Sequence, residues 1–63
     1  MKVREVVRLL EKDGWFLMRT RGSHQQFKHP TKVGLVTVPG SRGDEVAPGT
    51  LNNILKQAGL KKN

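Results

Sequence analysis

Hydrophobic residues recur along the chain with two different periods, and the change between them divides the sequence into predicted elements. Near the N-terminus they follow an i, i+3, i+4, i+7 spacing, which places one apolar stripe on a helix: Val3, Val6, Val7 and Leu10. The same spacing returns near the C-terminus: Leu51, Ile54, Leu55 and Ala58. These patterns predict a helix over residues 2–13 that Gly14 ends, and a second helix that Pro48 opens and Gly59 ends.

The residues between the two helices change to period two, which is typical of β-strands. We expect three strands, over residues 15–20, 24–29 and 35–38. The first turn is Arg21-Gly22-Ser23, and Pro30 ends the middle strand because proline cannot donate a ladder hydrogen bond. Neither helix can bury its stripe alone. The predicted class is therefore α+β, ordered α-β-β-β-α, with a three-stranded antiparallel sheet and two helices packed on one face.

Strand parity predicts which side chains of the middle strand face the helices. Phe27 is the one large apolar residue there, so its face, shared with Gln25 and His29, should point to the core. Three side chains would then point to the open face of the sheet: His24, Gln26 and Lys28.

The first strand is apolar on both faces, so parity alone does not decide its orientation. We assign Trp15 and Leu17 to the core. Phe16 and Met18 are then expected at the surface, where a lone chain rarely tolerates such side chains without a partner.

Length and charge narrow the class of protein. With 63 residues and no cysteine, the chain has room for one domain, residues 1–63, without a disulfide framework or a cysteine zinc site. No apolar run approaches the roughly 20 residues that span a bilayer, so we expect a cytoplasmic protein with no membrane contact. Twelve Lys and Arg against five Asp and Glu give a net charge of +7, which attracts polyanions or merely aids solubility. The basic residues are dispersed from Lys2 to Lys62, which favours a charged folded surface over a basic tail.

His24 is the first candidate for chemistry. It follows Gly22 and Ser23, where a glycine turn with a bare backbone lets an anion approach closely. An imidazole, with an ordinary pKa near 6.5, can take a proton from a ribose 2′-hydroxyl at neutral pH. An ordinary exposed strand residue fits the same spacing, and spacing alone favours that interpretation.

The other polar residues give weaker signals. The basic groups nearest the turn and strand ends either bind phosphates or form a solvated face: Arg19, Arg21, Lys28, Lys32 and Arg42. Ser23 would bond a phosphate or its own turn. His29 is expected to be a packed strand-end residue, and no metal or cofactor is expected, because the two histidines have opposite parity. The 40–47 loop is expected to be mobile, with Asp44 and Glu45 as solvated surface.

Several segments, in order and over nearly the whole chain, carry a family resemblance. They are Leu10-Glu11-Lys12-Asp13-Gly14-Trp15, then Gly22-Ser23-His24 with Phe27, His29 and Pro30, then Val36-Thr37-Val38-Pro39, Pro48-Gly49-Thr50-Leu51 and Ile54-Leu55-Lys56-Gln57-Ala58-Gly59. Together they resemble the HicA family, the small mRNA interferase toxins of bacterial and archaeal HicA–HicB toxin–antitoxin pairs.

The resemblance implies a fold similar to a double-stranded-RNA-binding domain and a ribonuclease activity on mRNA, with His24 as the catalytic residue. It also implies a HicB-type antitoxin that covers the active face. From the strand parity we expect Phe16, Met18, His24 and Gln26 to contact this partner, and we expect the toxin alone to be a monomer. The chain departs from many members after Pro39, where Gly40 and Ser41 replace a histidine or basic residue and Arg42 is the nearest charge. A second general acid would have to be His29 or water.

These expectations combine into a metal-independent endoribonuclease. His24 would act as the base, and the RNA-binding residues would be Arg19, Arg21, Gly22, Ser23, Lys28 and Arg42. The alternative is a non-catalytic RNA-binding module with the same fold and charge. DNA binding is disfavoured because the second helix carries only Lys56 between its ends.

Overall fold

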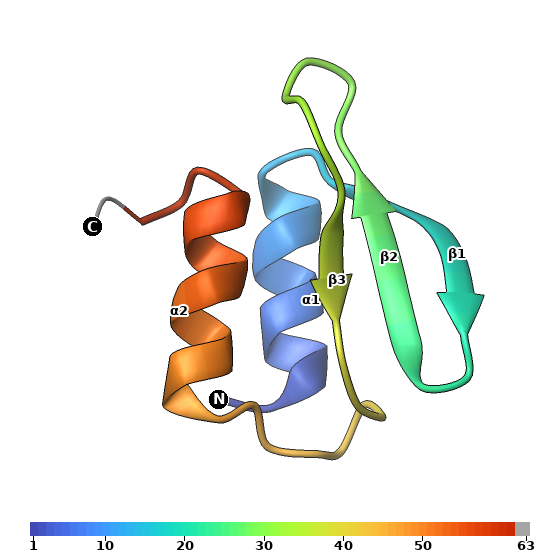
Figure 1. Ribbon diagram of the computed structural model, residues 1–63, viewed down its shortest axis with the longest axis vertical. Coiled ribbons are helices and arrows are strands. Elements are labelled where there is room, and N and C mark those ends of the chain that lie inside the picture. The colour runs from blue at the N-terminus through green and yellow to red at the C-terminus, as the bar shows by residue number, and fades with distance from the viewer. Residues whose placement is uncertain (62–63) are drawn as a thin grey trace.

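The computed structural model describes residues 1–61 and has the predicted order of elements (Figure 1). They are α1 (Val3–Lys12), β1 (Phe16–Arg21), β2 (His24–Lys28), β3 (Val36–Val38) and α2 (Pro48–Gln57). The sheet is antiparallel with strand order β1-β2-β3, so the α+β class and the α-β-β-β-α order are confirmed. Lys62, the last of the dispersed basic residues, lies outside the described part of the chain.

The hydrophobic core lies between the helices and one face of β2 and β3. In Figure 1, β3 runs along one edge of α1, α2 lies on the other side of α1, and β1 is the strand farthest from both helices. The buried side chains come from the helical stripes, the sheet and the loops between them: Val3, Val6, Leu10, Trp15, Phe27, Val36, Val38, Val46, Ile54 and Ala58. The predicted orientation of Phe27 toward the helices is confirmed.

The burial predicted for Leu17 is wrong. Trp15 is 2% exposed and belongs to the core, but Leu17, two residues later, is 47% exposed. The physical reason is the position of β1 at the outer edge of the sheet, beyond the reach of either helix (Figure 1). Phe16 and Met18 are exposed as predicted, at 49% and 39%, so all three apolar residues of β1 remain accessible.

The 40–47 loop, expected to be mobile, is tied to the N-terminus of α1. The backbone N–H groups of Val3 and Arg4 donate to the carbonyl oxygens of Asp44 and Arg42, at 2.9 and 3.2 Å. First-turn N–H groups of a helix have no partner within it, so these carbonyls satisfy donors that would otherwise be unpaired. Val46 is buried in the core, which fixes the end of the loop.

The two loop acids, expected to be merely solvated, are exposed but bonded. The Asp44 carboxylate accepts a hydrogen bond from the Ser41 backbone N–H at 2.9 Å. The Glu45 carboxylate pairs with the amino group of Met1 at 3.2 Å. These contacts therefore help to fix the conformation of the loop, although both side chains are exposed to solvent.

Candidate functional site

The turn between β1 and β2 places His24 at the first position of β2. Gly22 and Ser23 form a two-residue connection, because Arg21 and His24 are the last paired residues of the hairpin. Gly22 has a φ of +58°, whereas Ser23 has a negative φ. Positive φ at the first central residue alone is the pattern of a type II′ turn, whose twist matches that of the strands. The glycine therefore sets the geometry that starts β2 at His24.

A β-bulge at Met18 decides where the basic side chains of β1 point. Leu17 pairs with Phe27 and Arg19 pairs with Gln26, so the register shifts by one residue between them. Directly opposed residues of an antiparallel pair share a face. Simple alternation from Leu17 would turn Arg19 toward the helices, but the extra residue moves it to the open face. The Arg19 Nε atom accordingly donates to the Gln26 Oε1 atom at 2.7 Å.

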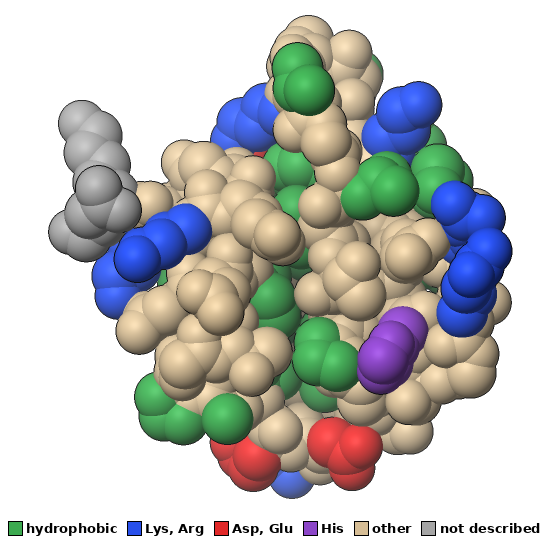
Figure 2. Space-filling view, viewed as in Figure 1, with side chains coloured by type: hydrophobic (Ala, Val, Ile, Leu, Met, Phe, Trp, Pro, Cys, Tyr) green, Lys and Arg blue, Asp and Glu red, His purple; other side chains and the backbone are tan. Residues whose placement is uncertain are grey.

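The open face of the hairpin therefore carries His24 among basic groups. Arg21 lies directly opposite His24, and Arg19 lies one pair further along the same face. His24 is exposed, and neither β1 nor β2 contains a carboxylate. In the view of Figure 2 a histidine lies at the surface, with Lys and Arg side chains along the neighbouring edge. This arrangement exposes one imidazole in a locally positive field.

The far end of the same face combines a cation with an exposed aromatic ring. Lys28 pairs with Phe16, and both side chains are exposed. Lys28 is four residues from His24, a separation of about 13 Å along a strand. It can therefore reach a flanking phosphate of a bound strand, whereas Arg21 is placed beside the imidazole.

Arg42 lies on the other side of the hairpin. It lines a hollow of about 220 Å³ together with the turn residues Gly22 and Ser23, and also with Thr20 and Gln25. Thr20 and Gln25 are paired and share the helix-facing side, so this hollow opens away from the His24 side chain. The structure thus brings Arg42 to the turn but not to the face that His24 shares with Arg19 and Arg21.

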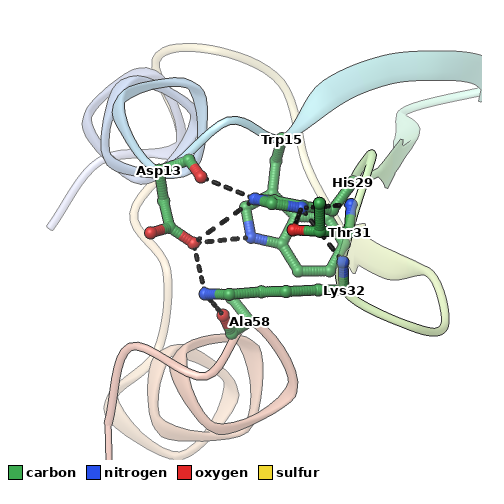
Figure 3. A network of polar contacts seen from close by, with 6 residues as sticks. All are labelled: Asp13, Trp15, His29, Thr31, Lys32 and Ala58. Atoms are coloured by element: carbon green, nitrogen blue, oxygen red, sulfur yellow. Dashed lines mark hydrogen bonds and ion pairs between the residues drawn. The ribbon is translucent and has the colours of Figure 1, made fainter.

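His29 is a packed residue, as predicted. Its side chain is 9% exposed, and its ring contacts that of Trp15 edge-on, with centroids 5.1 Å apart (Figure 3). The Nδ1 atom accepts from the backbone N–H groups of Thr31 and Lys32, both at 3.1 Å. These donors assign the ring proton to Nε2, which donates to the Asp13 carbonyl oxygen at 2.6 Å. Both ring nitrogens are occupied, so His29 has no free group to act as a second acid beside His24.

An ion pair missed by the sequence analysis completes this network. The Lys32 Nζ atom donates to the Asp13 Oδ2 atom at 2.5 Å and to the Ala58 carbonyl oxygen at 2.8 Å (Figure 3). The hydrogen bond from Lys32 lowers the pKa of the Asp13 carboxyl below its ordinary value of 3.8, against an opposing contribution from desolvation. Lys32 is therefore a structural cation that joins the ends of both helices. Its ammonium group is engaged by these two oxygen atoms.

Across residues 1–61, no cluster of three or more His, Cys, Asp or Glu side chains is placed to hold a metal ion. Within the same residues no helix is both long and apolar enough to cross a membrane.

Comparison with known proteins identifies the family. The sequence-family model for the HicA toxin of bacterial toxin–antitoxin systems matches residues 3–60, which include both helices and all three strands. No curated protein matches the chain at a significant level.

Proposed function

The chain belongs to the HicA toxin family of bacterial toxin–antitoxin systems, and we propose that it is a metal-independent endoribonuclease that cleaves mRNA. The observation that supports this most is the exposed His24 on the same strand face as Arg19 and Arg21. An mRNA strand on this face would meet a proton acceptor and two cations on two strands that carry no carboxylate of their own. Its substrate places its action in the cytoplasm.

In the proposed reaction, His24 is the general base. An imidazole nitrogen takes the proton of a ribose 2′-hydroxyl, and the 2′-oxygen forms a bond to the adjacent phosphorus. The bond from phosphorus to the 5′-oxygen breaks, and that oxygen leaves with a proton. The products are a 2′,3′-cyclic phosphate and a 5′-hydroxyl. Because both nitrogens of His29 are engaged, the leaving-group proton comes from water or from the imidazolium formed at His24.

The basic residues divide by position in this proposal. Arg21, opposite His24, stabilises the charge that develops on the phosphoryl oxygens. Arg19 and Lys28 hold the flanking phosphates, and the backbone at Gly22 and Ser23 lets the strand approach the turn. Arg42, on the other side of the hairpin, contributes only to the general positive field around the turn.

We also propose that a HicB-type antitoxin covers the open face and that the toxin alone is a monomer. Phe16, His24 and Gln26 share that face, and Met18 is exposed at the bulge beside them. Burying an apolar edge strand together with the proposed base would both stabilise the complex and block access to RNA.

The second candidate function is a non-catalytic RNA-binding module of the same fold. Domains that bind double-stranded RNA read about 16 base pairs by contacting two minor grooves. The two-residue turn of this hairpin gives it little reach toward a second groove, so the geometry favours the enzyme.

A turnover assay with a modified RNA separates the two functions. The protein, at a tenth of the RNA concentration, should shorten a labelled single-stranded RNA with a chelator present and leave cyclic phosphate ends. A 2′-deoxy substitution at a mapped cleavage position should abolish cleavage there, because the nucleophile is missing. A gel shift without shortening would support the binding module, and loss of cleavage on chelation would contradict metal independence.

A further inference from the structure

A groove separates α1 from the helix-facing side of β1. Its volume is about 230 Å³, and the apolar residues that line it are Val7 of α1, Leu17 of β1 and, beneath them, the buried Phe27 of β2. Leu17 is exposed because β1 extends past the helices (Figure 1), so the groove lies where the sheet has no helix to cover it. This surface is on the opposite side of the hairpin from His24.

Three guanidinium groups border the groove. Arg4 and Arg8 come from successive turns of α1, and Arg42 comes from the loop tied to the start of that helix. None of the three pairs with a carboxylate among residues 1–61. Glu11 is the one acidic residue that lines the groove. The surface thus combines an aliphatic floor with an uncompensated positive rim.

We propose that this groove binds an acidic, amphipathic segment of a partner protein. One aliphatic side chain of the segment would lie between Val7 and Leu17, and flanking carboxylates would pair with Arg4, Arg8 and Arg42. Such pairing gives orientation and rate of association as well as affinity. The inference rests on the proposed toxin–antitoxin partnership only for the identity of the partner, which would be the antitoxin.

The chemistry of the groove favours a peptide over RNA. Single-stranded RNA is usually held by bases stacked on exposed aromatic rings. The aromatic residue here, Phe27, is 1% exposed, and the accessible apolar surface is aliphatic. Gln25, which also lines the groove, has a buried Oε1 atom with no hydrogen-bond partner. A peptide backbone can supply an N–H donor to it, whereas a phosphate has none.

A partner anchored in the groove would hold β1 from the side away from the candidate base. Since β1 is an edge strand with exposed apolar residues, the remainder of the partner could pass around it to the open face. The groove would then contribute to the affinity for the partner without contacting His24. Substitutions of the groove residues should therefore weaken partner binding without affecting RNA cleavage.

Fluorescein-labelled 15-residue peptides test the proposal without any assay of cleavage. Two acidic peptides present leucines flanked by glutamates at either extended or helical spacing, and two matched peptides replace every glutamate with lysine. At least one acidic peptide should bind and shift the backbone NMR signals of Val7, Leu17 and Gln25. The lysine peptides should not bind.

Charge reversal identifies the surface. Arg4→Glu with Arg8→Glu should weaken acidic-peptide binding by at least about tenfold and create affinity for the matching lysine peptide. Gained affinity cannot result from unfolding, and a glutamate at position 4 suits the positive end of the helix. Arg19→Glu with Arg21→Glu, on the open face, is the charge-matched control and should change peptide binding less than about twofold.

Three results would overturn the proposal. The first is that neither acidic peptide binds, and the second is that the NMR shifts are confined to the open face. The third is that reversing Arg4 and Arg8 weakens the binding of single-stranded RNA as strongly as the binding of the peptide. The last would identify the groove as a nucleic-acid surface. A protein that binds the acidic peptide in the groove but does not cleave RNA would contradict the proposed enzyme and leave the proposed peptide site standing.

Discussion

Replacing His29 with alanine should destabilise the protein strongly. The same substitution at His24, five positions earlier in the chain, should not. The substitution at His29 removes the acceptor for the N–H groups of Thr31 and Lys32 and the donor to the Asp13 carbonyl. Each lost hydrogen bond costs about 1 kcal/mol, less for the exposed Thr31 N–H. Loss of the edge-on ring contact adds roughly 0.5–1.5 kcal/mol. The sum is about 2–4 kcal/mol.

That loss is large for a chain of this size. A total stability of about 3–9 kcal/mol is expected for 63 residues, so His29→Ala should leave a marginally folded protein. His29→Asn is the graded variant, because its Oδ1 atom can take the place of Nδ1 and recover the two N–H bonds. His24→Ala is the surface control, expected within about 0.5 kcal/mol of the unsubstituted chain.

Urea unfolding followed by tryptophan fluorescence measures these differences, since the single Trp15 packs against His29. The expected order of stability is unsubstituted and His24→Ala, then His29→Asn, then His29→Ala. A loss below about 1 kcal/mol for His29→Ala would refute the structural role assigned to this histidine. It would also return His29 to consideration as a second acid in the reaction.

Two further predictions concern the ion pair and the bulge. Because Lys32 lowers the Asp13 pKa on folding, the stabilisation from this carboxyl is fully present above its ordinary pKa of 3.8 and is lost as the pH falls through the lower folded-state value. Thermal unfolding between pH 2 and 6 should therefore show the destabilisation by Asp13→Asn shrinking in acid; a constant difference would contradict the pairing. Deleting Met18 should give a regular ladder with Arg19 still on the open face, whereas deleting Thr20 should turn Arg19 toward the helices. A plot of the log binding constant for single-stranded RNA against log salt has a negative slope, whose magnitude should decrease by about 0.7 only for the Thr20 deletion. Equal slopes for the two deletion variants would contradict the assigned faces.

The elements of the fold follow from local patterns in the sequence. The spacing of apolar residues is sufficient to define both helices, and Gly14 and Gly59 end them with positive φ as expected. The turn at Gly22 is equally local, because a two-residue hairpin of this type needs a glycine at its first central position. Patterns of this kind depend on neighbours in the chain, so they can be read without knowing the tertiary structure.

The misses all depend on tertiary position. Leu17 has the right parity for the core, but no helix reaches the edge strand on which it lies. The bulge at Met18 has no proline or glycine to signal it, yet it decides the face on which Arg19 lies. The pairing of Lys32 with Asp13 joins residues 19 positions apart, which no local pattern indicates.

The candidate site was therefore predictable in its residues more than in its arrangement. His24 and Arg21 follow from the turn, because the residues that flank a two-residue hairpin oppose each other. Arg42 was grouped with them by proximity in sequence to the third strand, but it lies on the other side of the hairpin. Arg4 and Arg8 lie off the apolar stripe of the first helix, and only the uncovered edge strand gives them a groove to border.

Cleavage by the His24→Ala variant tests the central claim most directly. The variant should not shorten labelled single-stranded RNA during a period in which the unsubstituted protein completes many turnovers. Its urea midpoint and its RNA affinity should stay close to those of the unsubstituted protein. Loss of cleavage with folding and binding intact would assign the proton-transfer step to this imidazole. Undiminished cleavage by His24→Ala would contradict the proposal that His24 is the catalytic base.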